Sequence, residues 1–256
     1  MPQSEKIIEG KEHDDWIRSL ELSHNEIGDI GSNLLTGFGL NGLENLILSS
    51  CNIGPNGIEA ICNNSEWSNL RELMLDMNTF GNKGCESLGR NTTWKNLKIL
   101  NLNNNQIDET GMSEIIKNKS WVFSLEKLSL MTNNLGDKGA ILLAGSQGRS
   151  DNQIEIQEVS TLDTPIIWMN LKQLDLTNNS IGDEGAIAIA QYTGWKKLEV
   201  LRLRNNQVGD RGASGIGANI VWKNLKTLDL ACNQYGVEGA VAIAKNSSWV
   251  NLKSLP

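Results

Sequence analysis

Histidine, a side chain that often performs catalysis, is sparse in this chain, and no recognised catalytic motif occurs. The only two histidines, His13 and His24, stand in no HExxH motif or other paired-ligand spacing, and neither a GxSxG nor a Walker motif occurs. Residues 37–42 (GFGLNG) have the letters of a dinucleotide-binding fingerprint, but they follow a predicted helix, so we interpret them as a chance match in a loop. The sequence therefore predicts no enzyme, with no catalytic residue, cofactor or metal.

Carboxylates are numerous, and several recur at equivalent positions along the chain. Asp137, Asp183 and Asp210 each follow a glycine and precede an apolar segment with helical spacing. A carboxylate in this place can accept hydrogen bonds from the free N–H groups of a first helical turn. The recurrence predicts helix capping, with Asp183 as the N-cap of its own helix, rather than a general acid and base.

The cysteines and the glycosylation sequons are also interpreted structurally. Cys51, Cys62, Cys85 and Cys232 show no CxxC or metal-ligand rhythm; an even count could form two disulfides, but we favour free, mostly buried thiols. Four of the five Asn-x-Ser/Thr sequons lie just before a recurring tryptophan, where Asn and Ser also form turns. Glycosylation would require a secretory route. The sequons are at Asn63, Asn91, Asn118, Asn178 and Asn246.

Charge and hydropathy narrow the class of partner. The net charge of −7 opposes nucleic acid or an anionic membrane as the main partner, because binding to either depends on a basic surface. The first sixteen residues hold no apolar segment of signal-peptide length, and nowhere do about eighteen apolar residues run together. We therefore expect a cytoplasmic protein that binds another protein, neutral or basic in charge.

The chain is built from eight copies of one pattern, L-x-x-L-x-L-x-x-N/C-x-I/L-G-x-x-G, each followed by an apolar helical stretch. The copies start 27 or 28 residues apart from Leu43 to Leu125 and from Leu171 to Leu225, and a looser copy starts at Ile17. Leucines alternate with polar residues in the first part, as in a half-buried strand. Ala186, Ile189 and Ala190 show the spacing of one helical stripe in the second part. The pattern predicts an α/β solenoid with a parallel sheet inside and helices outside.

This pattern resembles the leucine-rich repeat family, and in particular its ribonuclease-inhibitor-like class. The resemblance implies a horseshoe with the sheet on its concave face and the helices on its convex face. We expect residues 1–15 to form a polar N-terminal cap, and residues 16–256 to form one domain of about eight repeats plus a partial ninth. An insertion at about 146–165 interrupts the period and is either a recognition element or an outer excursion.

Two further residue types recur with the repeat. Tryptophans stand mostly three residues before the next strand, where we expect the ring to fill the core and the indole donor to reach the loop rim. An asparagine, replaced once by cysteine, stands where each strand ends, and its amide can satisfy backbone groups of adjacent turns. We interpret this column as structural; it comprises Asn25, Cys51, Asn78, Asn105, Asn133, Asn179, Asn206 and Asn233.

The outward residues of the strands are the predicted partner-binding surface. They include apolar side chains that a solvated sheet does not need, and two arginines between aspartates that can anchor an interface. A sheet of eight short strands offers about 550 Å², less than the roughly 800 Å² of a standard interface, so the loops around Gly54, Gly136, Gly182 and Gly209 must contribute to tight binding. The candidate residues are Ile47, Met74, Asp76, Ile99, Asn101, Met131, Asp175, Arg202, Arg204 and Asp229.

The sequence thus favours a non-catalytic protein-protein interaction module. The resemblance also admits a regulator of a small GTPase, the substrate-targeting portion of a larger enzyme such as a ubiquitin ligase, and a bacterial effector delivered into a host cell. The chain stops partway through the ninth strand, so Leu252 and Leu255 are expected at an open edge. Self-association or docking through this C-terminal edge is a further hypothesis.

Overall fold

The computed structural model describes residues 16–121, 123–145 and 169–256. The expected N-terminal cap (1–15) and the insertion (146–165) lie outside these residues. Within them, strands and helices alternate regularly, and all the strands join one parallel sheet in sequence order. The strands are β1 (Ser19–Glu21), β2 (Asn45–Ile47), β3 (Glu72–Met74), β4 (Ile99–Asn101), β5 (Lys127–Ser129), β6 (Gln173–Asp175), β7 (Val200–Arg202) and β8 (Thr227–Asp229).

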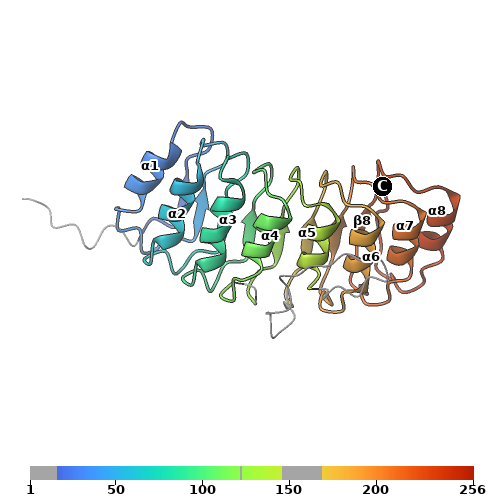
Figure 1. Ribbon diagram of the computed structural model, residues 1–256. Helices are drawn as coiled ribbons and strands as arrows, with labels where there is room; N and C mark the ends of the chain where they lie inside the picture. The colour runs from blue at the N-terminus through green and yellow to red at the C-terminus, as the bar shows by residue number, and fades with distance from the viewer. Residues whose placement is uncertain (1–15, 122, 146–168) are drawn as a thin grey trace, which may run out of the picture.

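The helices form a second layer on one side of the sheet (Figure 1). Each helix packs against the next one along the chain, so the molecule is an elongated stack of strand-helix units. The helices are α1 (Gly28–Leu35), α2 (Pro55–Asn63), α3 (Gly81–Arg90), α4 (Glu109–Ile115), α5 (Gly136–Leu143), α6 (Asp183–Gln191), α7 (Asp210–Gly217) and α8 (Val237–Ala244). The α/β leucine-rich repeat architecture predicted from the sequence is therefore present.

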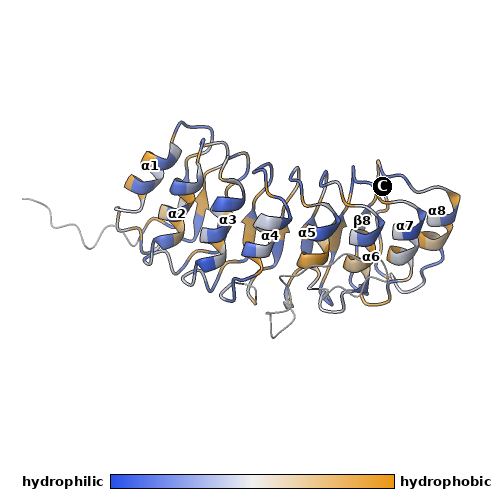
Figure 2. Ribbon diagram, viewed as in Figure 1, coloured by the Kyte–Doolittle hydropathy of each residue, from blue (hydrophilic) through white to orange (hydrophobic). Residues whose placement is uncertain are grey.

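The core lies between the two layers. The leucines at the centre of β2 to β8, such as Leu46 and Leu174, are fully or almost fully buried, and the predicted helical stripe Ala186, Ile189 and Ala190 is buried too. Each helix along the stack contains both hydrophilic and hydrophobic residues (Figure 2). Burial therefore follows the repeat that the sequence shows.

The tryptophans fill this core, with two departures from expectation. Those at 67, 94, 121, 195, 222 and 249 are buried, whereas Trp16 is 75% exposed. The indole nitrogens of Trp67, Trp94, Trp195, Trp222 and Trp249 do not reach the loop rim: they are buried, and they have no hydrogen-bond partner in the described part of the chain. Burial of the tryptophan ring in the core therefore stabilises the fold by more than the lost hydrogen bond of the indole nitrogen costs.

The asparagine column links consecutive turns by hydrogen bonds. Asn206 accepts at Oδ1 from the backbone N–H groups of Asn179 and Ile181 at 3.0 Å, and its amide nitrogen donates to the carbonyls of Leu176 and Leu203 at 2.9 Å. Cys51, at the same place in its repeat, only donates: its thiol lies 3.1 Å from the carbonyl of Leu22. The side chains thus pair backbone groups that the fold would otherwise bury alone.

A second asparagine column lies three residues before the tryptophans. The sequence predicted turn-forming asparagines here at the sequons, but not their hydrogen bonds between repeats. Asn118 donates to the carbonyls of Leu88 and Asn91 and accepts from the backbone N–H of Ser120. Asn91 and Asn118 are 4% and 1% exposed, so these two sequon asparagines serve the turn. The constant spacing of three residues between asparagine and tryptophan is the sequence feature that could have revealed this column. It comprises Asn64, Asn91, Asn118, Asn219 and Asn246.

Asp183 caps a helix, but not its own, so that prediction was wrong. Gly182 is the N-cap of α6, while Asp183 Oδ1 accepts from the N–H groups of Gly209 and Gly212, at the start of α7, at 2.7 and 2.8 Å. Asp137 serves α6 and Asp210 serves α8 in the same way. The aspartate lies in the first turn of one helix and therefore reaches sideways to the next.

At the C-terminal end the chain begins a ninth turn. Ser254 forms a parallel bridge to Thr227 of β8, and Leu252 packs against the core. Leu255 is 49% exposed, as expected of the edge, but Leu252 is half-buried. The outer side of α8 exposes Val237 and Val241.

Candidate functional site

The candidate site is the open face of the sheet, opposite the helices. Strand register sorts its side chains into three rows that cross the strands, which we name the first, middle and last concave rows. Every residue in them is half-buried or exposed. The first row is Ser19, Asn45, Glu72, Ile99, Lys127, Gln173, Val200 and Thr227. The middle row is Glu21, Ile47, Met74, Asn101, Ser129, Asp175, Arg202 and Asp229. The last row is Ser23, Ser49, Asp76, Asn103, Met131, Thr177, Arg204 and Ala231.

All ten candidate residues project from these rows, but they do not form one patch. Ile47 and Met74 are register partners, and Ile99 lies on the strand beside Met74. Met131, 37% exposed, lies two residues after β5, apart from these three. The apolar part of the surface is therefore centred on β2 to β4.

Hydrogen bonds fix the polar residues between these apolar groups. Asp76 Oδ1 accepts from the hydroxyl of Ser49 at 2.7 Å and from the amide of Asn101 at 2.9 Å. Asn103 Oδ1 accepts from Ser129 Oγ at 2.6 Å and from the backbone N–H of Met131 at 2.7 Å. These partners hold the side chains in place before any ligand arrives, which lowers the entropy lost on binding.

The arginines differ from each other. Arg202 Nη1 lies 3.4 Å from Asp175 Oδ2, and Asp229, its register partner on the other side, instead accepts from the N–H of Ala231 at 3.0 Å. Arg204 is exposed, and no ion pair to it occurs within the described ranges. Its neighbours in the last row, Thr177 and Ala231, are small. Arg204 is thus the arginine available to a partner.

A row of ion pairs runs along the edge where the strands begin. Glu126 lies 2.7 Å from Lys172 and 3.4 Å from Lys98, and Glu44 pairs with Arg18 and Arg71. The hydrogen bond from Lys172 is the main cause of the lowered pKa of Glu126. We did not predict this edge row, although its charges recur at one place in the repeat.

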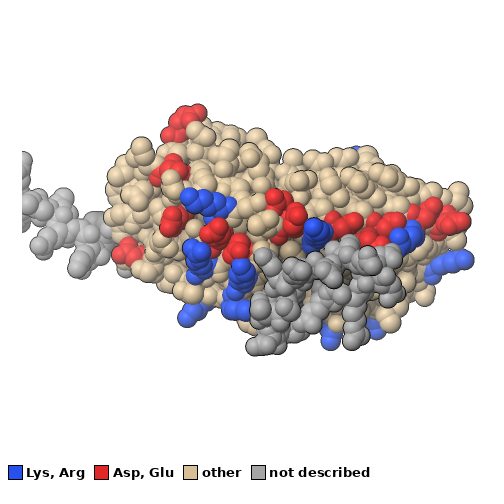
Figure 3. Space-filling view, in the orientation of Figure 1, with Lys and Arg blue, Asp and Glu red and all other residues tan. Residues whose placement is uncertain are grey.

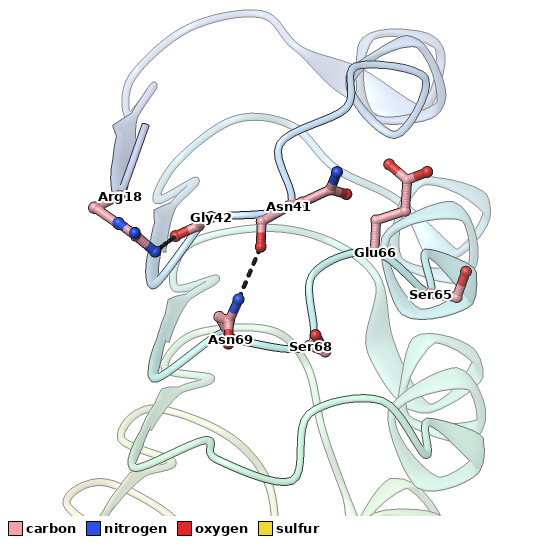
Figure 4. A pocket seen from close by; sticks show the side chains of 7 residues that line it. All are labelled: Arg18, Asn41, Gly42, Ser65, Glu66, Ser68 and Asn69. Atoms are coloured by element: carbon pink, nitrogen blue, oxygen red, sulfur yellow. Dashed lines mark hydrogen bonds between the residues drawn. The ribbon is translucent and has the colours of Figure 1, made fainter. Parts of the chain in front are cut away.

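A polar cleft of about 470 Å³ opens at the same edge between the first repeats (Figure 4). Arg18 donates to the carbonyl of Gly42 at 3.1 Å on one side, and Asn69 donates to the carbonyl of Asn41 at 2.9 Å on the other. Glu66 is the single carboxylate among its lining residues. The cleft therefore lacks the carboxylate pair that general acid-base chemistry commonly uses.

The described residues give little support for metal binding or for cysteine-based catalysis. They contain no group of three or more His, Cys, Asp or Glu placed to hold a metal ion. All four cysteines are free, and burial raises the pKa of the Cys51, Cys62 and Cys85 thiols, which leaves them poor nucleophiles. On the helical face, acidic side chains follow one another over α6 to α8 (Figure 3), where Asp183 and Asp210 serve as caps.

Comparison with known proteins settles the family. The family described as Leucine Rich repeat matches residues 13–31, 42–62, 68–89, 95–115, 123–144, 169–190, 196–217 and 223–244. The chain belongs to the leucine-rich repeat family. No curated protein matches the sequence.

Among solved structures, this leucine-rich repeat chain is similar to one titled "Plant peptide hormone receptor RGFR1 in complex with RGF2". The TM-score is 0.50 at 18% identity, and the match covers 93% of this chain but 31% of that one. At this identity the likeness concerns the fold alone. None of the helices in the described ranges has the length and apolar run that a membrane span requires.

Proposed function

We propose that this protein is a non-catalytic module that binds a partner protein through its concave rows and the adjacent loops. The observation that carries the proposal is the open sheet face, on which Ile47, Met74 and Ile99 lie together and Arg204 has no ion pair in the described part of the chain. A stable fold does not need apolar side chains on a solvated face, whereas an interface uses them as anchors.

The size of the face indicates what it can hold. The strands alone offer about 550 Å², enough for a peptide segment but less than a standard interface. The similar solved structure is, by its title, a plant peptide hormone receptor in complex with RGF2, which supports this mode of use for the fold. A folded partner would also have to contact the loops that follow the strands.

Two finer assignments belong to the same proposal. A full helix in each 27- or 28-residue unit supports the ribonuclease-inhibitor-like class, and repeats that group with another class in a family tree would contradict it. Four free cysteines support a reducing, cytoplasmic location. A glycan on the exposed Asn63 or Asn178 of protein from its natural source would contradict that location.

The test is affinity capture with matched variants. One variant carries Met74→Glu, in the apolar group, and Arg204→Glu, at the exposed arginine; the control carries Lys83→Glu and Arg90→Glu, two exposed positions on α3. We expect one protein to be captured by the wild type and the control, and capture to fall at least tenfold with the concave variant. Equal capture by all three would refute the concave site. A small GTPase as the captured protein would support the regulator instead.

A further inference from the structure

Charge is distributed unequally along the concave rows. From β1 to β4 the rows contain the carboxylates of Glu21, Glu72 and Asp76 and no Lys or Arg. Asp76 and Glu21 accept hydrogen bonds within the protein, whereas the Glu72 side chain has no hydrogen bond or ion pair in the described residues. Met74 lies on the same strand as Glu72, with Ile47 beside it. This part of the face therefore favours an apolar side chain with a cation beside it.

From β5 to β8 the balance reverses. Lys127, Arg202 and Arg204 stand against two carboxylates, and both carboxylates have partners within the protein. Asp175 is paired with Arg202 and also accepts from the N–H of Thr177 at 3.0 Å, while Asp229 accepts from the N–H of Ala231. Lys127 and Arg204 have no ion pair in the described residues, and of these two the planar guanidinium of Arg204 is the better match for a carboxylate.

We infer that the face recognises a polarised peptide segment, with a Lys or Arg beside an apolar residue over β2 and β3 and an Asp or Glu side chain over Arg204. The inference rests on the proposed function and specifies its partner. Four strand intervals separate β3 from β7, which is about 19 Å at 4.8 Å each, and an extended segment covers this distance in about six residues. A short linear motif is thus sufficient to contact both parts.

The probe is a phage library of random twelve-residue peptides, selected on the immobilised full chain. For the wild type we expect enriched sequences to place an acidic residue about six positions from an apolar residue that has Lys or Arg beside it. With Arg204→Glu, the acidic position should change to Lys or Arg. With Glu72→Lys, the cation beside the apolar residue should be lost while the acidic residue remains. Arg90→Glu, on the helical face, should select the wild-type pattern.

A synthetic peptide of the enriched sequence gives the quantitative test. Arg204→Glu should weaken its binding at least tenfold, and exchanging the peptide's acidic residue for Lys should restore binding to that variant. An acidic preference unchanged by Arg204→Glu, or absent from the wild-type selection, would overturn the inference. If the selected peptides instead bind equally to the Met74→Glu/Arg204→Glu double variant, recognition lies off the concave rows, and the proposed function itself fails.

Discussion

Adjacent repeats are joined at both edges of the sheet, and the interactions that join them differ. At the edge where strands end, buried amides and helix-capping carboxylates join each turn to the next, as at Asn206 and Asp183. At the edge where strands begin, exposed ion pairs such as Glu126 with Lys172 also join the turns, beside the buried amides of the second asparagine column. Buried hydrogen bonds are costly to remove, whereas exposed ion pairs contribute little. The buried amides therefore contribute more to the stability of the stack than the exposed ion pairs do.

The largest expected effect is the loss of a central amide. Asn206→Ala leaves two N–H groups and two carbonyls without their partner in a buried site, and we expect the free energy of unfolding to fall by about 3–5 kcal/mol. Urea unfolding measures this. Asn25→Ala is the matched control, since Asn25 is exposed and donates only within its own turn, to Leu22 and Ser23.

Asn25→Ala should reduce the free energy of unfolding by less than about 1 kcal/mol, because water can replace its hydrogen bonds. Equal losses for the two variants would show that burial does not distinguish these asparagines, and the comparison between the edges would fail.

A smaller effect is expected at the capping carboxylates. Asp183→Ala removes the acceptor for Gly209 and Gly212 at the start of α7, and should cost about 2 kcal/mol. Glu109 occupies the equivalent place in α4, but the following helix, α5, begins differently, with Gly136 at a φ of 57°. Glu109→Ala should therefore change the free energy of unfolding by less than about 0.5 kcal/mol.

Thermal and urea unfolding of the two variants provide the measurement. If Glu109→Ala proves as damaging as Asp183→Ala, the carboxylate acts through its own helix and not through the next one, contrary to the hydrogen bonds described.

The Asp183 case shows where sequence reasoning reached its limit. The leucine period of two and the helical stripe of Ala186, Ile189 and Ala190 predicted the layers, because burial follows local periodicity. The aspartate's partner could not be read in the same way, since it lies one repeat away and depends on how closely adjacent helices pack. The same limit applied to the indole nitrogens, whose burial reflects packing between layers.

The sequence predicted which side chains lie on the open face of the sheet, but not which neighbours each of them contacts there. Alternation along a strand places Arg202 and Arg204 on one face, and the structure has both there. Their different pairing depends on neighbours in other repeats: Asp175 beside Arg202, and Thr177 and Ala231 beside Arg204. The strand pattern therefore located the surface, while its charge pattern required the register of the whole sheet.

The smallest expected effect is at the edge where the strands begin, and it depends on pH. The hydrogen bond from Lys172 lowers the pKa of Glu126 below its ordinary value, so the ionised side chain stabilises the fold at neutral pH. This contribution is present above the unfolded-state pKa and is lost as the pH falls through the lower folded-state pKa. Glu126→Gln should reduce the free energy of unfolding by less than about 1 kcal/mol at pH 7.

Unfolding of wild type and Glu126→Gln, followed from pH 7 into the acid range, tests the sign of this effect. The difference between them should shrink as Glu126 becomes protonated, and it should also shrink in roughly 1 M salt, where the Debye length is about 3 Å. A difference that persists at low pH would assign the loss to packing or hydrogen bonding. The contrast between buried amides and exposed charges would then not hold.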